Sequence, residues 1–289
     1  ACGRLRRVTP DERLQRYGEL VVRVGANVQP GQEVVVLCQV EHVDTARAVA
    51  REAYRAGAKR VVVQYGDQHL RRAAIELGPG EMLGQTPPHI LDWVRGWRDE
   101  RPALISLTGD FELDLLGDLD PALVARSEPH DLRALYLPLV SERLINWAIV
   151  PSPNPGWATT VFGEPDLERL WQAVATATRL DAPDPVAAWR AHDAKLKARA
   201  ASLHERRFDA IRFHGPGTDL TVGLLPTSRW MCAAFETQDG IEHIPNLPTE
   251  EVFTSPDWRR TEGTVRATYP LSVTGAVVRD LEVRFAAGK

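Results

Sequence analysis

Strand-like and helix-like patterns alternate along the first two thirds of the chain. The run GQEVVVL at 31–37 is almost wholly apolar and β-branched, which is typical of a strand buried on both faces. Residues 43–58 then place apolar side chains at helical spacing and stop at Gly57, and KRVVVQY at 59–65 is a second β-branched run. This order predicts a βαβ unit with two parallel strands.

Similar elements lie on both sides of this unit. TPDE at 9–12 combines a threonine N-cap, a proline at the first helical position and a glutamate three residues after the cap, so a helix begins there. PALISLTGD at 102–110 and NWAIVPS at 146–152 are typical of further strands, with helical sequence between them. The alternation predicts an α/β fold over residues 9–180, with a mainly parallel sheet covered by helices.

The pattern changes after about residue 165. Residues 164–180 and 184–208 are helical segments separated by DAPDP, whose prolines and aspartates indicate a break and a new helix start. Short strands separated by turns follow Phe208, and we expect them at 209–213, 219–224, about 262–269, 271–278 and 281–286. AVVRDLEVRF at 276–285 is typical of a tight hairpin.

These patterns divide the chain. Residues 1–8 follow no pattern and are expected to be an upstream extension or an expression remnant. We expect an N-terminal α/β domain at 9–180, a helical linker at 181–208 and an incomplete, mainly antiparallel α+β catalytic domain at 209–289.

Composition narrows the class of protein. The 289 residues are 44% hydrophobic and 26% charged, the balance of a soluble globular protein with a sizeable core. The formal net charge of −4 argues against nucleic acid and anionic membranes as partners, and favours small molecules or peptides. Three scattered cysteines, no apolar run near ~20 residues and no secretory signal pattern lead us to expect a cytoplasmic protein.

Several common sites are disfavoured. The turn after the first strand, CQVEHVDTA, has no glycine, and no GxxxxGK[ST] loop occurs, so dinucleotide and P-loop sites are not expected. The glycine-rich turn HGPGTDL at 214–220 joins two strands and predicts a hairpin turn. LHERR at 203–207 begins like a zincin helix, but Phe208 stands where the second histidine belongs. Surface or capping roles are expected for the scattered histidines His42, His89, His130, His192 and His243.

One acidic pair is more informative. NLPTEEVFTSPD at 246–257 places Glu250 and Glu251 after a proline and before a β-branched and aromatic run. Successive side chains of an extended segment point to opposite faces, so at most one of the two is expected to face a buried site. Taken alone the pair favours solvated charge, because glutamate is seldom buried without a partner or a metal.

Three blocks in this order resemble the thermophilic metalloaminopeptidase family of aminopeptidases T and S: NWAIVPSPNPGWA at 146–158, RFHGPGTDLTVGL at 212–224 and PNLPTEEVFTSP at 245–256. The resemblance implies removal of N-terminal amino acids from peptides with broad specificity, two divalent metal ions and a homodimer of two-domain subunits. It also implies that Glu251, or alternatively Glu250, is a metal ligand. We expect Glu251 to point into a cleft and Glu250 to turn away from it.

The sequence also departs from that family. The resemblance implies that the remaining ligands and a catalytic tyrosine correspond to positions after Lys289. We therefore expect no catalytic residue within this chain and weak or no metal binding by it alone. The metal is expected to be zinc, cobalt, manganese or magnesium, all of which accept carboxylate oxygen. Two alternatives stay open: a non-catalytic scaffold or dimerisation fragment, and a small-molecule binder that uses the carboxyl ends of the parallel strands.

Overall fold

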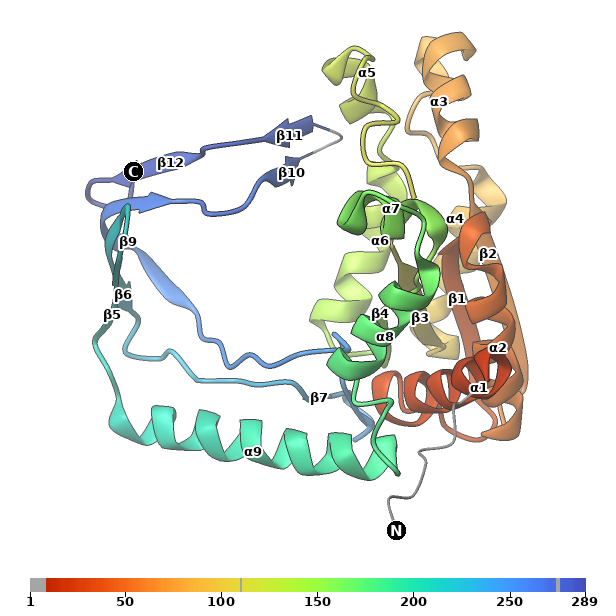
Figure 1. Cartoon of the computed structure of the whole chain (residues 1–289), viewed down its shortest axis with the longest axis horizontal. Helices are drawn as coiled ribbons and strands as arrows, with labels where there is room; N and C mark the ends of the chain where they lie inside the picture. Colours follow the sequence, from red (N-terminus) through yellow and green to blue (C-terminus); the bar gives the residue numbers. More distant parts are fainter. Residues whose placement is uncertain (1–8, 110, 274–275) are drawn as a thin grey trace.

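Two parts of unequal size make up the fold, and a long helix joins them (Figure 1). The computed structural model describes residues 9–109, 111–273 and 276–289. The first part is an α/β unit, the second is an antiparallel sheet, and the joining helix is α9 (Pro185–Arg206). Among the described residues, none of the helices has the length and apolar character needed to cross a membrane.

The α/β unit contains a parallel sheet of four strands in the order β2-β1-β3-β4. Val36 at its centre pairs with Val63 on one side and with Ile105 on the other. All the pairings are parallel, which confirms the predicted α/β class. The strands are β1 (Glu33–Gln39), β2 (Arg60–Gly66), β3 (Ala103–Thr108) and β4 (Trp147–Pro151).

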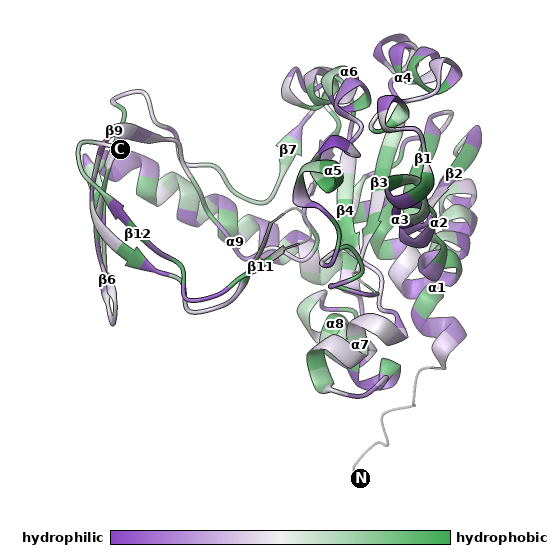
Figure 2. Cartoon of the chain, turned by 90° about the horizontal axis from the view of Figure 1, so that it is seen from above, coloured by the Kyte–Doolittle hydropathy of each residue, from purple (hydrophilic) through white to green (hydrophobic). Residues whose placement is uncertain are grey.

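Helices cover both faces of this sheet, as Figure 2 shows. One face carries α1 (Pro10–Leu20), the π-helical turn Val21–Gly25, α2 (Val43–Arg55) and α8 (Leu167–Ala177). The other face carries α4 (Pro88–Glu100) and α6 (His130–Ser141). The capping box predicted at the start of α1 is present, because Thr9 and Glu12 exchange side-chain to backbone hydrogen bonds.

Alternation along the strands gives each face its own core. Val34 and Val36 belong to the cluster under α1, α2 and α8, whereas Val35 packs with Val94 and Leu139 of α4 and α6. The remaining helical elements lie at the ends of the sheet: α3 (Gln68–Leu77), α5 (Pro121–Arg126), α7 (Pro155–Phe162) and 3₁₀ turns at Val40–His42 and Gly80–Met82.

The second part is an antiparallel sheet in the order β12-β9-β6-β5. Its strands are β5 (Ala210–Gly215), β6 (Thr218–Leu224), β9 (Pro256–Arg266) and β12 (Glu282–Phe285). The turn between β5 and β6 has Gly217 at φ 75°, a conformation that favours glycine, and the predicted hairpin turn is confirmed.

The predicted hairpin at 276–285 is wrong. β11 (Ala276–Val278) pairs with β10 (Leu271–Val273), and β12 pairs with β9. β10 and β11 therefore run antiparallel to each other, and the strand expected over 271–278 is divided in two. Residues 274–275 lie outside the described residues. Arg279 and Asp280, in the middle of the segment predicted as a hairpin, lie between β11 and β12, and Asp280 has φ 54°.

Between β6 and β9 the chain leaves the antiparallel sheet and returns to the α/β unit. This excursion, residues 225–255, includes the short strands β7 (Phe235–Glu236) and β8 (Glu242–His243). The Ile149 amide of β4 donates to the Pro245 carbonyl at 2.6 Å, and the Leu247 amide donates to the Ile149 carbonyl at 3.1 Å. Leu247 is 1% exposed and belongs to the core of the α/β unit. The expected domain limits at 180 and 208 remain a prediction.

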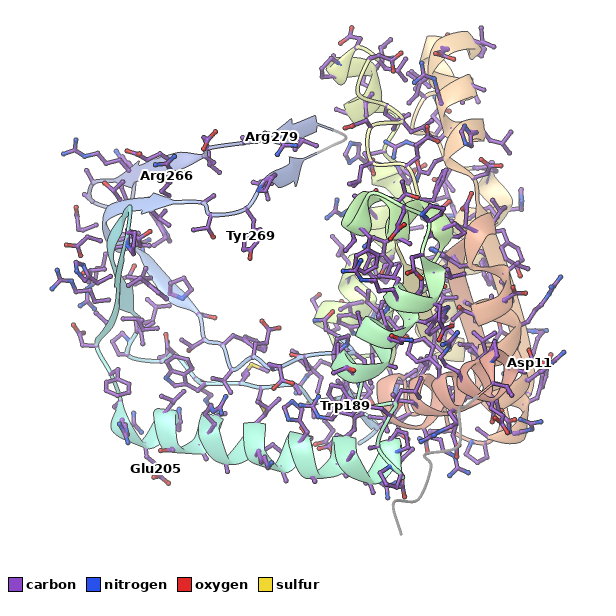
Figure 3. The ribbon with its side chains drawn as sticks, in the orientation of Figure 1. Asp11, Trp189, Glu205, Arg266, Tyr269 and Arg279 are labelled. Atoms are coloured by element: carbon purple, nitrogen blue, oxygen red, sulfur yellow. The ribbon has the colours of Figure 1, made fainter. Side chains whose placement is uncertain are left out.

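Trp189 fixes α9 to the α/β unit. Its side chain is fully buried, its indole N–H donates to the Thr178 carbonyl at 2.6 Å, and Arg179 lies over its ring at 4.8 Å. Figure 3 shows Trp189 on the part of α9 beside the α/β unit and Glu205 near the opposite end. The burial of this one indole therefore holds the end of a helix whose other end carries the antiparallel sheet.

Replacing Trp189 by alanine is expected to lower the free energy of unfolding by about 3–5 kcal/mol, because it leaves a large cavity and an unpaired Thr178 carbonyl. Lys195→Ala, at an exposed position of the same helix, is the control and should change stability by less than about 0.5 kcal/mol. Urea unfolding followed by circular dichroism measures both. Equal stability of the two variants would contradict the role given to Trp189.

Candidate functional site

The acidic pair lies on the part of the excursion that touches the α/β unit. Before the pair, Leu247 is held against β4 by the hydrogen bond to Ile149. After it, Phe253 forms a β-bridge with Met231, with N–O distances of 2.8 and 3.0 Å. Both ends of the segment 247–253 are therefore fixed by backbone hydrogen bonds, and the two glutamates lie between them.

Glu250 is held by two basic side chains. Arg179 Nη2 donates to Glu250 Oε1 at 2.5 Å, and His192 Nε2 lies 3.3 Å from Oε2. Arg179 comes from the connection between α8 and α9, with φ 56°, and His192 comes from the first half of α9. The hydrogen bond from Arg179 lowers the pKa of Glu250, and burial opposes this shift.

His192 connects this ion pair to the backbone. Its Nε2 lies 2.9 Å from the Thr249 carbonyl and its Nδ1 lies 3.0 Å from Arg179 Nη2. A carbonyl only accepts and a guanidinium only donates, so Nε2 carries the proton and Nδ1 accepts. The ring also packs edge-on against Trp189, with centroids 5.3 Å apart. We call Arg179, His192 and Glu250 the clamp.

Glu251 has a different environment. Its side chain is exposed, and its carboxylate makes no hydrogen bond or ion pair with any residue in the described ranges. Its backbone amide lies 3.4 Å from Thr249 Oγ1. Glu250 and Glu251 both line a shallow hollow of about 410 Å³ with Asn246, Pro248 and Thr249. Of the two carboxylates, the one on Glu251 is thus open to a ligand.

These residues do not form a metal centre by themselves. Within residues 9–109, 111–273 and 276–289, no cluster of three or more His, Cys, Asp or Glu side chains could hold an ion. A bound divalent ion needs several converging donors, whereas the site offers one uncommitted carboxylate and a second that Arg179 already neutralises. The donor set found here therefore fits only part of a metal site.

The histidine expectations need a partial correction. His89 and His130 are exposed, and His42 does cap the short turn after β1, with its Nδ1 3.3 Å from the Gln39 amide. His192 and His243, however, are 8% and 3% exposed and are not surface residues. Burial lowers the pKa of His243. Sequence reasoning missed the clamp, because Arg179 and His192 stand 71 and 58 positions before Glu250 and no local pattern joins them.

The chain is similar to several known proteins over nearly its whole length. Aminopeptidase T of Thermus aquaticus is 43% identical over 284 residues, which cover 96% of this chain and 69% of that protein. Aminopeptidase 2 of Geobacillus stearothermophilus is 33% identical over 285 residues, 96% of this chain and 69% of that protein. The solved structure of wild-type AmpT from Thermus thermophilus matches with a TM-score of 0.88 and 38% identity, and covers 96% of this chain and 70% of that one.

A family model confirms the relationship that the three sequence blocks suggested. The model of the thermophilic metalloprotease family M29 matches residues 10–289, which contain both parts of the fold and the acidic pair. This chain therefore belongs to the thermophilic metalloprotease (M29) family.

Proposed function

We propose that this protein is a metal-dependent aminopeptidase that releases N-terminal amino acids from peptides. The observation that carries the proposal is the 43% identity with Aminopeptidase T over 96% of this chain. The similarity extends through the α/β unit, α9 and the antiparallel sheet, since the AmpT structure covers the same share of the chain. The relatives named aminopeptidases come from several genera, which supports a shared activity.

Within this function we assign Glu251 to the metal and Glu250 to the clamp. Both oxygens of the Glu250 carboxylate are engaged, Oε1 by Arg179 and Oε2 by His192, so it would have to lose one of these contacts before it could bind a cation, whereas the Glu251 carboxylate has none to lose. Anionic oxygen is a suitable donor for zinc, cobalt, manganese or magnesium. A metal in this family polarises the scissile carbonyl and activates water when it is bound.

The family resemblance supports four finer proposals. The centre holds two divalent ions, its other ligands and the catalytic groups come from the part of the relatives that this chain does not cover, the protein works in the cytoplasm, and it forms a homodimer. The second proposal agrees with the small donor set found in the described chain and with the 69% of Aminopeptidase T that is matched. The homodimer agrees with large apolar side chains left exposed on the antiparallel part: Phe213, Trp258 and Tyr269 at 50%, 56% and 83% (Figure 3 labels Tyr269).

The activity test uses two proteins. The 289-residue chain alone should hydrolyse an aminoacyl p-nitroanilide negligibly with zinc, cobalt or magnesium added. A chimera carrying the unmatched part of Thermus aquaticus Aminopeptidase T after Lys289 should be active, because it supplies the missing donors. Glu251→Gln in the chimera should lower kcat/KM by about 100-fold or more, which corresponds to ~3 kcal/mol of lost charge stabilisation.

Glu250→Gln is the matched control, since it makes the same chemical change at the neighbouring position and should keep most of the activity. An N-acetylated substrate, which lacks the free α-amine, should not be cleaved. Strong metal-dependent turnover by the 289-residue chain would contradict the need for further ligands. A larger loss in Glu250→Gln than in Glu251→Gln would exchange the two assignments.

The two variants should also differ in stability, and here Glu250→Gln should have the larger effect. Glu250→Gln is expected to lower the free energy of unfolding at pH 7 by about 0.3–1 kcal/mol, a modest value because its side chain is 68% exposed. Glu251→Gln should change it by less than about 0.5 kcal/mol. Because the folded pKa of Glu250 is lowered, the contribution is complete above the ordinary glutamate pKa of about 4.3 and is lost as pH falls through the folded pKa.

Urea unfolding of both variants at pH 7 and at pH 3 measures this effect. The difference between Glu250→Gln and the parent chain should shrink at the lower pH. A constant difference at the two pH values would show that the clamp does not act through the charge of Glu250.

The dimer proposal is tested by light scattering after gel filtration. The chimera at micromolar concentration should have twice its own chain mass. A monomer mass at every concentration would contradict the homodimer while leaving the activity proposal intact.

A further inference from the structure

A second hollow, of about 760 Å³, lies on the opposite face of the parallel sheet from the core that holds Leu247. It is bounded by β1, β2 and β3 below and by α4 and α6 at the sides. Figure 2 shows these two helices together on one side of the sheet. Its volume is in the range of small-molecule sites, about 300–1,000 Å³.

The hollow has the position at which open parallel sheets bind ligands. In the order β2-β1-β3-β4, the chain moves outward from β1 to β2 and then returns across β1 to β3. The strand order therefore reverses between β1 and β3, and the crevice forms where the connections separate at the carboxyl ends of the strands. Leu37 and Leu107, near the ends of β1 and β3, line it.

The floor of the hollow changes from apolar to polar where the helical cover opens. Deeper on this face, Val35 and Leu104 are buried in the core under α4 and α6. One step along the strands, Leu37 pairs with Gln64 on one side and Ser106 on the other, and all three line the hollow. The side chains of Gln64 and Ser106 make no hydrogen bond to other described residues. Two unpaired polar groups thus face a cavity that a ligand could enter.

The walls are aromatic. Trp93 and Trp97 of α4 meet edge to face with centroids 5.0 Å apart, and Tyr136 of α6 lines the other side. Trp97 is 4% exposed, and its indole N–H is buried with no hydrogen-bond partner among the described residues. Trp97 therefore contributes its ring to the wall of the hollow, because the N–H itself is not accessible.

The rim carries one charge of each sign. Arg133, in the first turns of α6, is exposed, and its guanidinium makes no ion pair or hydrogen bond with the described residues. Glu128, just before α6, uses Oε1 to pair with Arg71 at 2.6 Å and leaves Oε2 without a partner among the described residues. A ligand that satisfies both groups needs an anionic group for Arg133 and a hydrogen-bond donor for Glu128 Oε2. A phosphate ester would meet only one fixed cation and the carboxylate of Glu128.

We propose that this hollow binds a free α-amino acid with an aromatic side chain. Its carboxylate pairs with Arg133, its ammonium group pairs with the free oxygen of Glu128, and its ring lies against the aromatic walls. The proposed aminopeptidase would release molecules of this class, but the assignment stands on the hollow itself. It therefore fails or succeeds separately from the peptidase proposal.

Isothermal titration of the 289-residue chain with L-phenylalanine tests the proposal without any substrate or metal. Binding is expected with a Kd below about 1 mM. Phenylalaninamide lacks the carboxylate, N-acetylphenylalanine lacks the ammonium group and glycine lacks the ring. Each should bind at least about tenfold more weakly, because each loses one charge-assisted or aromatic contact.

Two variants locate the bound molecule. Arg133→Met removes the rim cation from an exposed position and should weaken L-phenylalanine about tenfold or more, and it should not change the affinity for phenylalaninamide. Ser106→Leu fills the floor and should also weaken binding. Arg95→Met is the matched control, since Arg95 lies on α4 and pairs with Asp92 but does not line the hollow.

If L-phenylalanine does not bind at roughly 10 mM, tenfold above the expected upper limit of its Kd, the proposal is overturned. So would unchanged affinity in both Arg133→Met and Ser106→Leu, because the amino acid would then bind elsewhere. Equal affinity for L-phenylalanine and phenylalaninamide would also overturn it, because the carboxylate would have no partner. Circular dichroism of each variant checks that the fold is retained.

Discussion

The return of the chain from the antiparallel sheet to β4 is the constraint on which the arrangement of the two parts depends. β6 and β9 are neighbours in one sheet, yet the 225–255 excursion between them crosses to the other part of the molecule. It is fixed there by the hydrogen bonds between Ile149 and residues 245 and 247, and by the burial of Leu247. Together with α9, the two crossings of the excursion make three covalent connections, so the acidic pair has a defined place on the α/β unit.

Two interactions of different strength hold this junction. Burial of Trp189 is worth several kcal/mol by the usual cost of removing a large aromatic side chain, ~3–5 kcal/mol. The ion pair between Arg179 and Glu250 is mostly solvent-exposed and adds up to about 1 kcal/mol. The indole therefore provides the stability. The clamp fixes the orientation of the Glu250 side chain, because Arg179 stacks on Trp189 while it binds Glu250.

Much of the fold could be predicted because its signals are local. The β-branched runs became β1 and β2, the capping box began α1, and Gly217 formed the turn between β5 and β6. The predictions that failed concern which strands pair with one another. The hairpin predicted for 276–285 does not form, because β11 pairs with the preceding β10 and β12 pairs with β9. Periodicity shows that a segment is extended but not which strand it joins.

The candidate site shows the same limit. The resemblance drew attention to Glu250 and Glu251, but only three-dimensional proximity shows that one is bound by Arg179 and His192 and the other is not. The sequence likewise gives no reason to connect Gln64 with Ser106, which meet across Leu37 only through the register of three strands. Both features arise from contacts between residues far apart in the chain.

The two sites lie on opposite faces of one sheet, and this follows from the alternation of side chains along its strands. Leu247 before the acidic pair packs in the cluster that contains Val34 and Val36, whereas the amino-acid hollow opens beside the cluster that contains Val35. The two sites share no lining residue, but Cys38 and Leu107 line the hollow and also belong to the cluster that contains Leu247, so the packed core is what connects the sites. Binding in the hollow could alter the acidic pair only by moving that core. Close packing on both faces of the sheet resists such movement. The structure therefore favours two sites that act independently.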